Sequence, residues 1–145
     1  MSRIDTKTIL KIIEKANEVR RYSYAPYSGF AVGAALLTKS GKVYLGCNIE
    51  NQSFGATNCA ERTAIFKAVS AGDRDFEAIA VCGAMEGEEP TKPAPPCGIC
   101  RQVMTEFCGP DFRILLHGEE GEPKEYTLTE ILPLQFDLKE YESKE

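Results

Sequence analysis

Two short stretches of this sequence constrain the whole chain: CAE at residues 59–61 and PCGIC at residues 96–100. Cys59, Cys97 and Cys100 offer three thiolates, and a catalytic zinc site needs three protein ligands plus an open position for water. Glu61 lies two residues after Cys59, close enough to reach that open position without binding the metal. Zinc lowers the pKa of bound water from about 16 to about 7, and a neighbouring carboxylate can accept a proton from it. The pattern therefore predicts a catalytic site with one zinc ion.

The residues around these cysteines favour metal binding. Thr57 and Asn58 are candidate N-caps for a helix that starts at the first stretch, and Pro96 is a candidate first residue of a second helix. Helix N-termini carry partial positive charge and lower the pKa of nearby thiols. Two helix starts directed at one point would therefore stabilise three thiolates. Arg62 and Arg101 adjoin the two stretches and could offset the remaining negative charge.

Besides simple buried thiols, two other interpretations of the cysteines stay open. A structural zinc site needs a fourth ligand, for which Cys47, Cys82, Cys108 and the single histidine, His117, are candidates, although none has tight ligand spacing to the others. A redox-active Cys-x-x-Cys motif in the second stretch is the other alternative. Glu61 is the feature that favours the catalytic site over both.

The composition excludes several classes of protein. The chain has 145 residues, 43% of them hydrophobic, and a net charge of −5. A general polyanion binder would normally show a basic patch, whereas Lys and Arg are scattered here, so we expect no nucleic-acid partner. Because the N-terminus lacks the apolar stretch of a signal peptide and no apolar run is long enough to span a bilayer, we expect no membrane association and a cytoplasmic location. In that compartment six cysteines favour metal binding over disulfides.

The hydrophobic pattern predicts strands that alternate with helices. A first helix, capped by Asp5, carries Ile9, Ile12, Ile13 and Ala16 at helical spacing. Strands are expected at residues 30–37, 43–47, 76–83, 112–116 and 125–128, the first of them buried on both faces because it lacks polar alternation. A helix follows each cysteine stretch, and a short helical turn starts at Thr129 and ends at Pro133. The order predicts a single domain, residues 1–145, of the α/β class: a three-layer α/β/α sandwich with a five-stranded mixed sheet and both cysteine helices on one face.

Several longer motifs extend the pattern along the chain. They are YAPYSGF at residues 24–30, GCNIEN at 46–51, NCAERT at 58–63, PCGICRQ at 96–102, and Leu132-Pro133 followed by Phe136. With these motifs the sequence resembles, nearly from end to end, the small cytidine deaminases of the homotetrameric, three-cysteine type. The resemblance implies hydrolytic deamination of cytidine and deoxycytidine to uridine and deoxyuridine, a step of pyrimidine salvage, in a homotetramer with one zinc ion per subunit.

The resemblance also implies roles for the residues of the metal site. Cys59, Cys97 and Cys100 match the zinc ligands of the family. Glu61 matches the proton shuttle, which takes a proton from water and gives it to N3 of the base. Arg62 matches the residue that hydrogen-bonds the ligand thiolates in three-cysteine members and so tunes their charge.

Five residues match positions that contact the substrate in the family. Asn48 and Glu50 match the residues that hold the ribose hydroxyls, and Phe30 matches one that packs against the pyrimidine. The backbone N–H of Ala60 matches the donor to O2 of the base, and Phe136 matches an aromatic residue that enters a neighbouring subunit's site. Simpler interpretations stay open: loop capping for Asn48 and Glu50, strand packing for Phe30, and packing of the tail for Phe136.

Three rival functions remain at this stage. A deaminase of nucleoside-like antibiotics would share the zinc motifs, and Asn48 and Glu50 argue instead for a ribose. A deaminase that edits nucleic acids would need a basic groove, which the acidic balance disfavours. A non-catalytic zinc module would have no use for Glu61. Leu134-Gln135 replaces the Gly-Ala often found in the family before Phe136, so the path of the tail is left open.

Overall fold

The computed structural model describes residues 4–142 and contains a five-stranded mixed sheet in the order β2-β1-β3-β4-β5. The strands are β1 (Phe30–Thr38), β2 (Val43–Cys47), β3 (Phe76–Met85), β4 (Arg113–His117) and β5 (Pro123–Thr127). β1 pairs antiparallel with both β2 and β3, and β4 pairs antiparallel with β5. Only β3 and β4 pair in parallel among the strands of this sheet. A parallel pair needs a crossover connection, which here contains the helix α3 (Gly98–Phe107).

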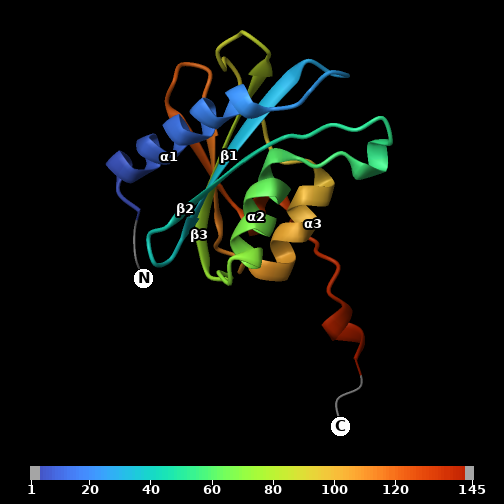
Figure 1. Ribbon diagram of the computed structural model, residues 1–145. Coiled ribbons are helices and arrows are strands. Elements are labelled where there is room, and N and C mark those ends of the chain that lie inside the picture. Colours follow the sequence, from blue (N-terminus) through green and yellow to red (C-terminus); the bar gives the residue numbers. More distant parts are fainter. Residues whose placement is uncertain (1–3, 143–145) are drawn as a thin grey trace.

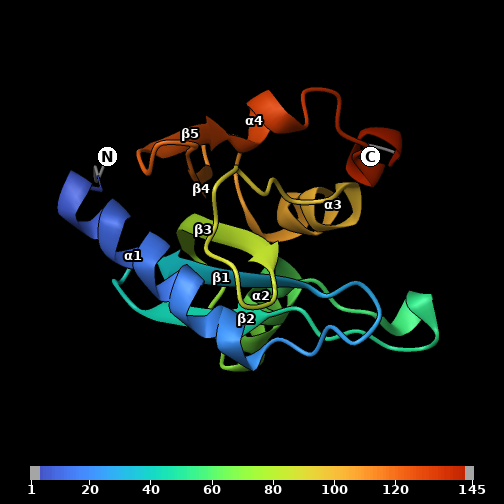
Figure 2. The same ribbon diagram turned by 90° about the horizontal axis from the view of Figure 1, so that it is seen from above.

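Helices cover both faces of the sheet. α1 (Thr6–Val19) crosses one face, and α2 (Ala60–Ser70) lies beside α3 on the other (Figures 1 and 2). This arrangement confirms the predicted three-layer α/β/α sandwich, with both cysteine helices on the same face. No helix within residues 4–142 is long and apolar enough to cross a membrane.

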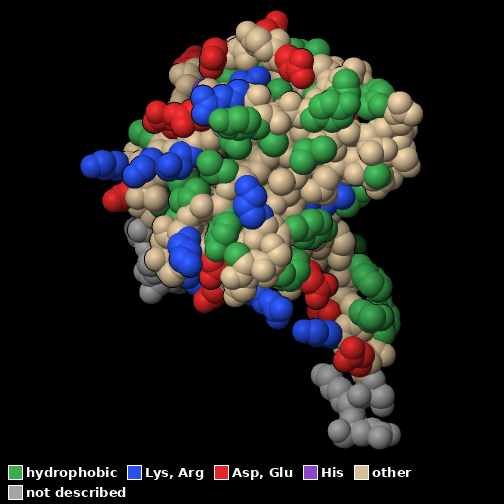
Figure 3. Space-filling view, viewed as in Figure 1, with side chains coloured by type: hydrophobic (Ala, Val, Ile, Leu, Met, Phe, Trp, Pro, Cys, Tyr) green, Lys and Arg blue, Asp and Glu red, His purple; other side chains and the backbone are tan. Residues whose placement is uncertain are grey.

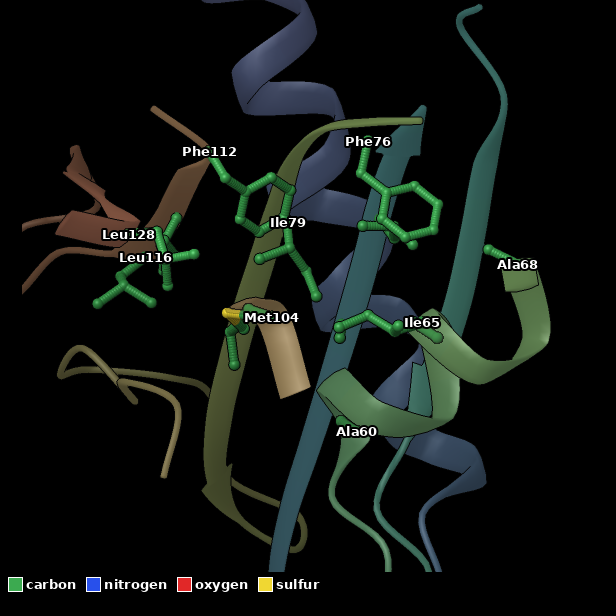
Figure 4. Packing of buried hydrophobic residues seen from close by; sticks show 14 residues of the cluster. Ala60, Ile65, Ala68, Phe76, Ile79, Met104, Phe112, Leu116 and Leu128 are labelled. Carbon is green, nitrogen blue, oxygen red and sulfur yellow. The ribbon is translucent and has the colours of Figure 1, made fainter. Parts of the chain in front are cut away.

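The core consists of two clusters separated by the sheet. Successive side chains of a strand point to opposite faces, so Ala34 and Leu36 of β1 pack under α2 and α3, whereas Ala35 and Leu37 pack under α1. All four are buried, which confirms the expectation that β1 is buried on both faces. Figure 4 shows the cluster under α2 and α3, where both helices and the sheet contribute buried side chains, among them Ile65, Ile79, Met104 and Leu116.

α1 is positioned by a cap and by a small residue beneath it. The carboxylate of Asp5 accepts a hydrogen bond from the Thr8 N–H over 2.7 Å, as the predicted cap requires. Gly33 of β1 lets the helix approach closely, since a Cβ atom at this position would lie 1.9 Å from the carbonyl oxygen of Ala16. α1 therefore lies almost directly on the backbone of β1.

The predicted elements are present, but several end elsewhere. β1 and β3 reach Thr38 and Met85 because they pair with each other along their whole length. β5 starts at Pro123, earlier than expected, because pairing with β4 extends to that residue. β5 is an edge strand with exposed polar side chains, so its hydrophobic pattern is weak, and proline is tolerated as its first residue.

The chain beyond the sheet forms a capped turn and an extended tail. Thr127 and Glu130 form a capping box at the start of α4 (Leu128–Ile131). The tail then leaves the body of the molecule and ends in the 3₁₀ turn η3 (Leu138–Tyr141) (Figure 1). The sequence predicts a frayed segment over residues 140–145; Tyr141 belongs to the turn, and residues 143–145 lie outside the described part of the chain. Two shorter 3₁₀ turns are η1 (Arg20–Tyr22) and η2 (Phe54–Ala56).

Candidate metal centre and active site

Cys59, Cys97 and Cys100 lie at the N-termini of α2 and α3. Cys59 and Cys97 themselves occupy the N-cap positions, without a side-chain capping bond, and Cys100 lies in the first turn of α3. The predictions of Thr57 or Asn58 as N-cap and of Pro96 as first helical residue are therefore wrong: both helices start one or two residues later. The Asn58 amide instead donates to the Thr63 hydroxyl over 3.0 Å, which braces the loop against the first turn of α2. The N-cap positions of α2 and α3 are therefore occupied by cysteines, whose thiols can bind a metal.

The distances between the three sulfur atoms fit a zinc ion. All three lie within 4.8 Å of one another, and the Sγ atoms of Cys59 and Cys97 are 3.7 Å apart. Two zinc–sulfur bonds of about 2.3 Å at a tetrahedral angle place their sulfur atoms about 3.8 Å apart. A disulfide would need a distance of about 2 Å, and all six cysteines are free. The donor set is therefore suited to zinc rather than to a redox disulfide.

No fourth ligand completes this cluster among the described residues. Cys47, Cys82, Cys108 and His117 are not part of the only group of metal-binding side chains that residues 4–142 contain. The Cys82 thiol, for example, lies under α1 and donates to the carbonyl oxygen of Ile13. A site with three protein ligands leaves one position open, as in catalytic zinc sites. Cys97 is exposed while Cys100 is buried, so the cluster opens to solvent on the side of Cys97.

The surroundings of the cluster favour the deprotonated form of Cys59. Its hydrogen bonds with Cys100 and Arg62 lower the pKa of Cys59 to about 5, against the opposing effect of burial. The same contact with Cys59, together with burial, raises the pKa of Cys100. The pair therefore loses its first proton at Cys59, and a bound divalent cation would favour loss of the second.

Two arginines adjoin the cluster but make different contacts. Arg62 donates from Nη2 to the Sγ atom of Cys59 over 3.4 Å, and its Nε is buried without a partner among the described residues. Arg101 points elsewhere: its Nε donates to the carbonyl oxygen of Pro96 and its Nη1 to that of Ile131, both over 2.7 Å. Arg62 can thus offset thiolate charge, whereas Arg101 braces the loop before α3 against the end of α4.

Glu61 lies in the first turn of α2, and its side chain is only 4% exposed. Burial raises the pKa of its carboxyl to about 7, and the nearby Cys59 thiolate adds to the rise. Glu61 is not part of the sulfur cluster, so it is free for proton transfer. Gly46 of β2 sets this geometry, because a Cβ atom there would lie 2.5 Å from the carbonyl oxygen of Ala60 and would push α2 away. The sequence reasoning did not identify this role of Gly46.

Asn48 and Glu50 both hold neighbouring backbone in place. The amide of Asn48 donates to the carbonyl oxygen of Phe30 over 2.8 Å and accepts from the N–H of Val32 over 2.9 Å. Glu50 accepts from the N–H groups of Tyr27 and Ser28. These contacts are the capping roles that the sequence left open as the simpler interpretation. They do not use all the hydrogen-bonding capacity of either side chain.

Ser28 connects these residues, and the sequence reasoning missed it. Its hydroxyl donates to a carboxylate oxygen of Glu50 over 2.5 Å and accepts from the N–H of Phe30 over 3.0 Å. Its position in the YAPYSGF motif was the available signal. A surface cavity of about 280 Å³ lies at this point, lined by Tyr27, Ser28, Glu50, Phe54 and Thr57.

The other predicted substrate residues differ in exposure. Phe30 begins β1 and is 38% exposed, so it is not a buried strand residue. Ala60 is fully buried as the first residue of α2, where a helix leaves its N–H without an intrahelical acceptor. Phe136 lies in the tail, 63% exposed and stacked on Tyr141 at 6.2 Å between ring centroids. The structure therefore does not bring Phe136 into the site of its own chain.

Fold and site together define a class of protein. It is an α/β sandwich that presents three thiols at the N-termini of two neighbouring helices, with a buried carboxyl group beside them. The model of the cytidine and deoxycytidylate deaminase zinc-binding region matches residues 6–116, and the chain belongs to this family.

Individual relatives agree with this assignment. A cytidine deaminase of Halalkalibacterium halodurans is 51% identical over 86% of this chain and 91% of its own length. The crystal structure of a cytidine deaminase from Burkholderia pseudomallei, 45% identical, superposes with a TM-score of 0.79 and covers 92% of this chain and all of the other. A blasticidin-S deaminase of Bacillus cereus is 32% identical over 88% of this chain and 91% of its own length.

Proposed function

We propose that this protein catalyses the hydrolytic deamination of cytidine and deoxycytidine to uridine and deoxyuridine, a reaction that serves pyrimidine salvage. The observation that carries the proposal is the buried Glu61 beside a cluster of three thiols with one side open to solvent. The relatives that are named cytidine deaminases support the choice of substrate. The balanced reaction consumes one water and releases one ammonia.

The chain's own residues can perform the proton transfers. Cys59, Cys97 and Cys100 would hold one zinc ion, which supplies Lewis acidity and so makes a water molecule a nucleophile at neutral pH. Glu61 takes a proton from that water and passes it to N3 of the base while the hydroxyl oxygen adds to C4. It then takes the second proton from this hydroxyl group and gives it to the amino group, which leaves as ammonia while the C4 carbonyl forms. Burial suits the carboxyl to this task, because it raises the pKa of Glu61 in the metal-free protein and so favours a group that can release a proton as well as accept one.

We assign substrate contacts to Ala60, Phe30, Glu50 and Asn48, of which Glu50 lines the cavity beside Ser28. The N–H of Ala60 donates to O2 of the base, as a free donor at a helix N-terminus can. Phe30 packs its exposed face against the pyrimidine. Glu50 has one of its four lone-pair sites left for a ribose hydroxyl after its bonds from Tyr27 and Ser28, and Asn48 has one N–H left after its two bonds to β1. Both thus combine support of the loop with ribose binding, and Arg62 tunes the thiolate charge.

The quaternary structure in this proposal is a homotetramer with shared sites. Figure 3 shows hydrophobic side chains along the tail, where Leu134 is 92% and Phe136 63% exposed. Exposed apolar side chains on a projecting segment are typical of an interaction surface. A neighbouring subunit's site is the destination we propose for Phe136. Each subunit would be one domain, residues 1–145, with no nucleic-acid or membrane partner and a cytoplasmic location, where its free thiols stay reduced.

A second candidate function is the deamination of a nucleoside-like antibiotic. The match to the blasticidin-S deaminase of Bacillus cereus favours it. The two activities differ in substrate, so turnover of cytidine, deoxycytidine and blasticidin S by the zinc-loaded protein, each followed by its change in ultraviolet absorbance, decides between them. Cytidine turnover supports our proposal, blasticidin S turnover alone replaces it, and no turnover of any substrate by the zinc-loaded protein indicates a non-catalytic zinc module.

A further inference from the structure

The ring of Phe30 rests on the sheet on the side of the metal centre. Phe30 pairs with Met85, and Val32 pairs with Gly83, so Phe30 and Gly83 are diagonal neighbours on adjacent strands. Both belong to the face that carries α2 and α3, because side chains two residues apart on a strand share a face and Val32 packs in that cluster. The rest of the Phe30 side chain remains open to solvent.

Gly83 leaves the space that the ring occupies. A Cβ atom at residue 83 would lie 2.9 Å from both Cε2 and Cζ of Phe30 and 3.0 Å from the Cβ atom of Ala94. Real Cβ atoms essentially never approach other atoms so closely, so a side chain there would have to move the ring. Gly83 does not have a positive φ angle. Its lack of a side chain therefore matters for space, not for backbone conformation.

The main chain at Phe30 is held on both sides and cannot easily absorb such a displacement. Its N–H donates to the hydroxyl of Ser28 over 3.0 Å, and its carbonyl oxygen accepts from Asn48 over 2.8 Å. At the next residue, Arg20 donates from Nε to the carbonyl oxygen of Ala31 over 2.9 Å. Added volume at residue 83 would therefore turn the ring outward, into the space in front of its exposed face.

We propose that Gly83 is a specificity-determining positioning residue that sets the depth of the Phe30 ring, and through it the space available to the pyrimidine. Gly83 does not touch the substrate and acts through Phe30. This inference rests on the proposed packing of Phe30 against the base. Ala94 also links that space to the proline-rich loop, residues 86–96, which leads directly into the second cysteine stretch.

The substitutions Gly83→Ala and Gly83→Val should raise KM for cytidine and leave kcat nearly unchanged. An interaction made equally in the ground and transition states changes KM alone, and an aromatic packing contact corresponds to about 2- to 10-fold in affinity. The rise in KM should be larger for Gly83→Val than for Gly83→Ala. It should also be larger for 5-methylcytidine than for cytidine, because 5-methylcytidine is larger. Gly109→Ala is the matched control, since nothing lies within 4 Å of a Cβ atom at that residue. Zinc content should be unchanged in every variant.

A double-mutant cycle with Phe30→Ala tests whether the effect passes through the ring. In the Phe30→Ala background, Gly83→Ala should no longer change KM, and its effect on the free energy of unfolding in urea should also shrink. Additive effects on KM in an active enzyme overturn the inference, even if the unfolding energies are coupled. If Gly83→Val does not fold, the Ala cycle decides alone. A wild-type protein without cytidine turnover would instead refute the proposed function and, with it, this specificity role.

Discussion

The substitution Glu61→Gln separates proton transfer from metal binding. Glutamine keeps the size and reach of the side chain but cannot accept a proton from water. A positioned general acid–base group contributes about 10²–10⁴-fold, and a single carboxyl serves several transfers in the proposed reaction. We therefore expect kcat to fall by about 10⁴-fold or more, or about 5.5 kcal/mol. Zinc should stay at one ion per subunit, because Glu61 is not part of the sulfur cluster.

The same substitution should stabilise the metal-free protein at alkaline pH. Burial raises the pKa of Glu61 from its ordinary 4.5 to about 7. Because the folded pKa lies above the unfolded one, the carboxyl does not lower the free energy of unfolding below about pH 4.5. The folded state then loses stability as the pH rises from there through about 7. At about 1.4 kcal/mol per unit the full loss is about 3 kcal/mol. Glutamine does not ionise, so the Glu61→Gln variant does not lose this stability.

Urea unfolding of metal-free wild type and variant at about pH 5 and about pH 8 measures this effect. Most of the full difference, about 2–3 kcal/mol, should appear between the two conditions in favour of Gln. Glu14→Gln is the control, since Glu14 is exposed on α1. An equal difference at both pH values would refute the role of burial. Loss of zinc together with activity would show that Glu61 is a ligand, and retained turnover would refute the proposed mechanism.

Three further substitutions test the rest of the site. Cys97→Ala removes a metal ligand, so zinc measured by elemental analysis, activity and melting temperature should all fall; zinc retained at one per subunit contradicts the assignment. Arg62→Gln should raise the pKa of Cys59 in the metal-free protein, since the arginine helps to lower it; an unchanged ultraviolet titration of the thiolate excludes this role. Phe136→Ala should raise KM while sedimentation still reports about four subunits; a fully active wild-type monomer would rule out the shared site.

Local sequence patterns determined much of this protein in advance. The set of three cysteines and one glutamate, the cap at Asp5 and the order of strands and helices all follow from spacing along the chain. Interactions of this kind join residues a few positions apart, or repeat with the period of a helix or strand. The three-layer arrangement follows from them, because each element must bury its apolar face. The preference for a catalytic zinc site over a structural one with a fourth ligand likewise needed only the motif that contains Glu61.

Other properties were decided by contacts between distant segments. The motif did not reveal that Cys59 and Cys97 replace the expected caps, or that Arg101 points to Pro96 and Ile131 rather than to the thiols. The sequence also did not reveal that the Asn48 side chain bonds the backbone of β1, or that the Ser28 hydroxyl connects Glu50 to the Phe30 N–H. The physical reason is close packing: α1 and α2 can lie where they do because Gly33 and Gly46 leave room for the helix backbones, and the position of α2 in turn places the groups at its N-terminus. Spacing along the sequence predicts which residues form the site, and only the packing of the helices on the sheet determines where their side chains lie.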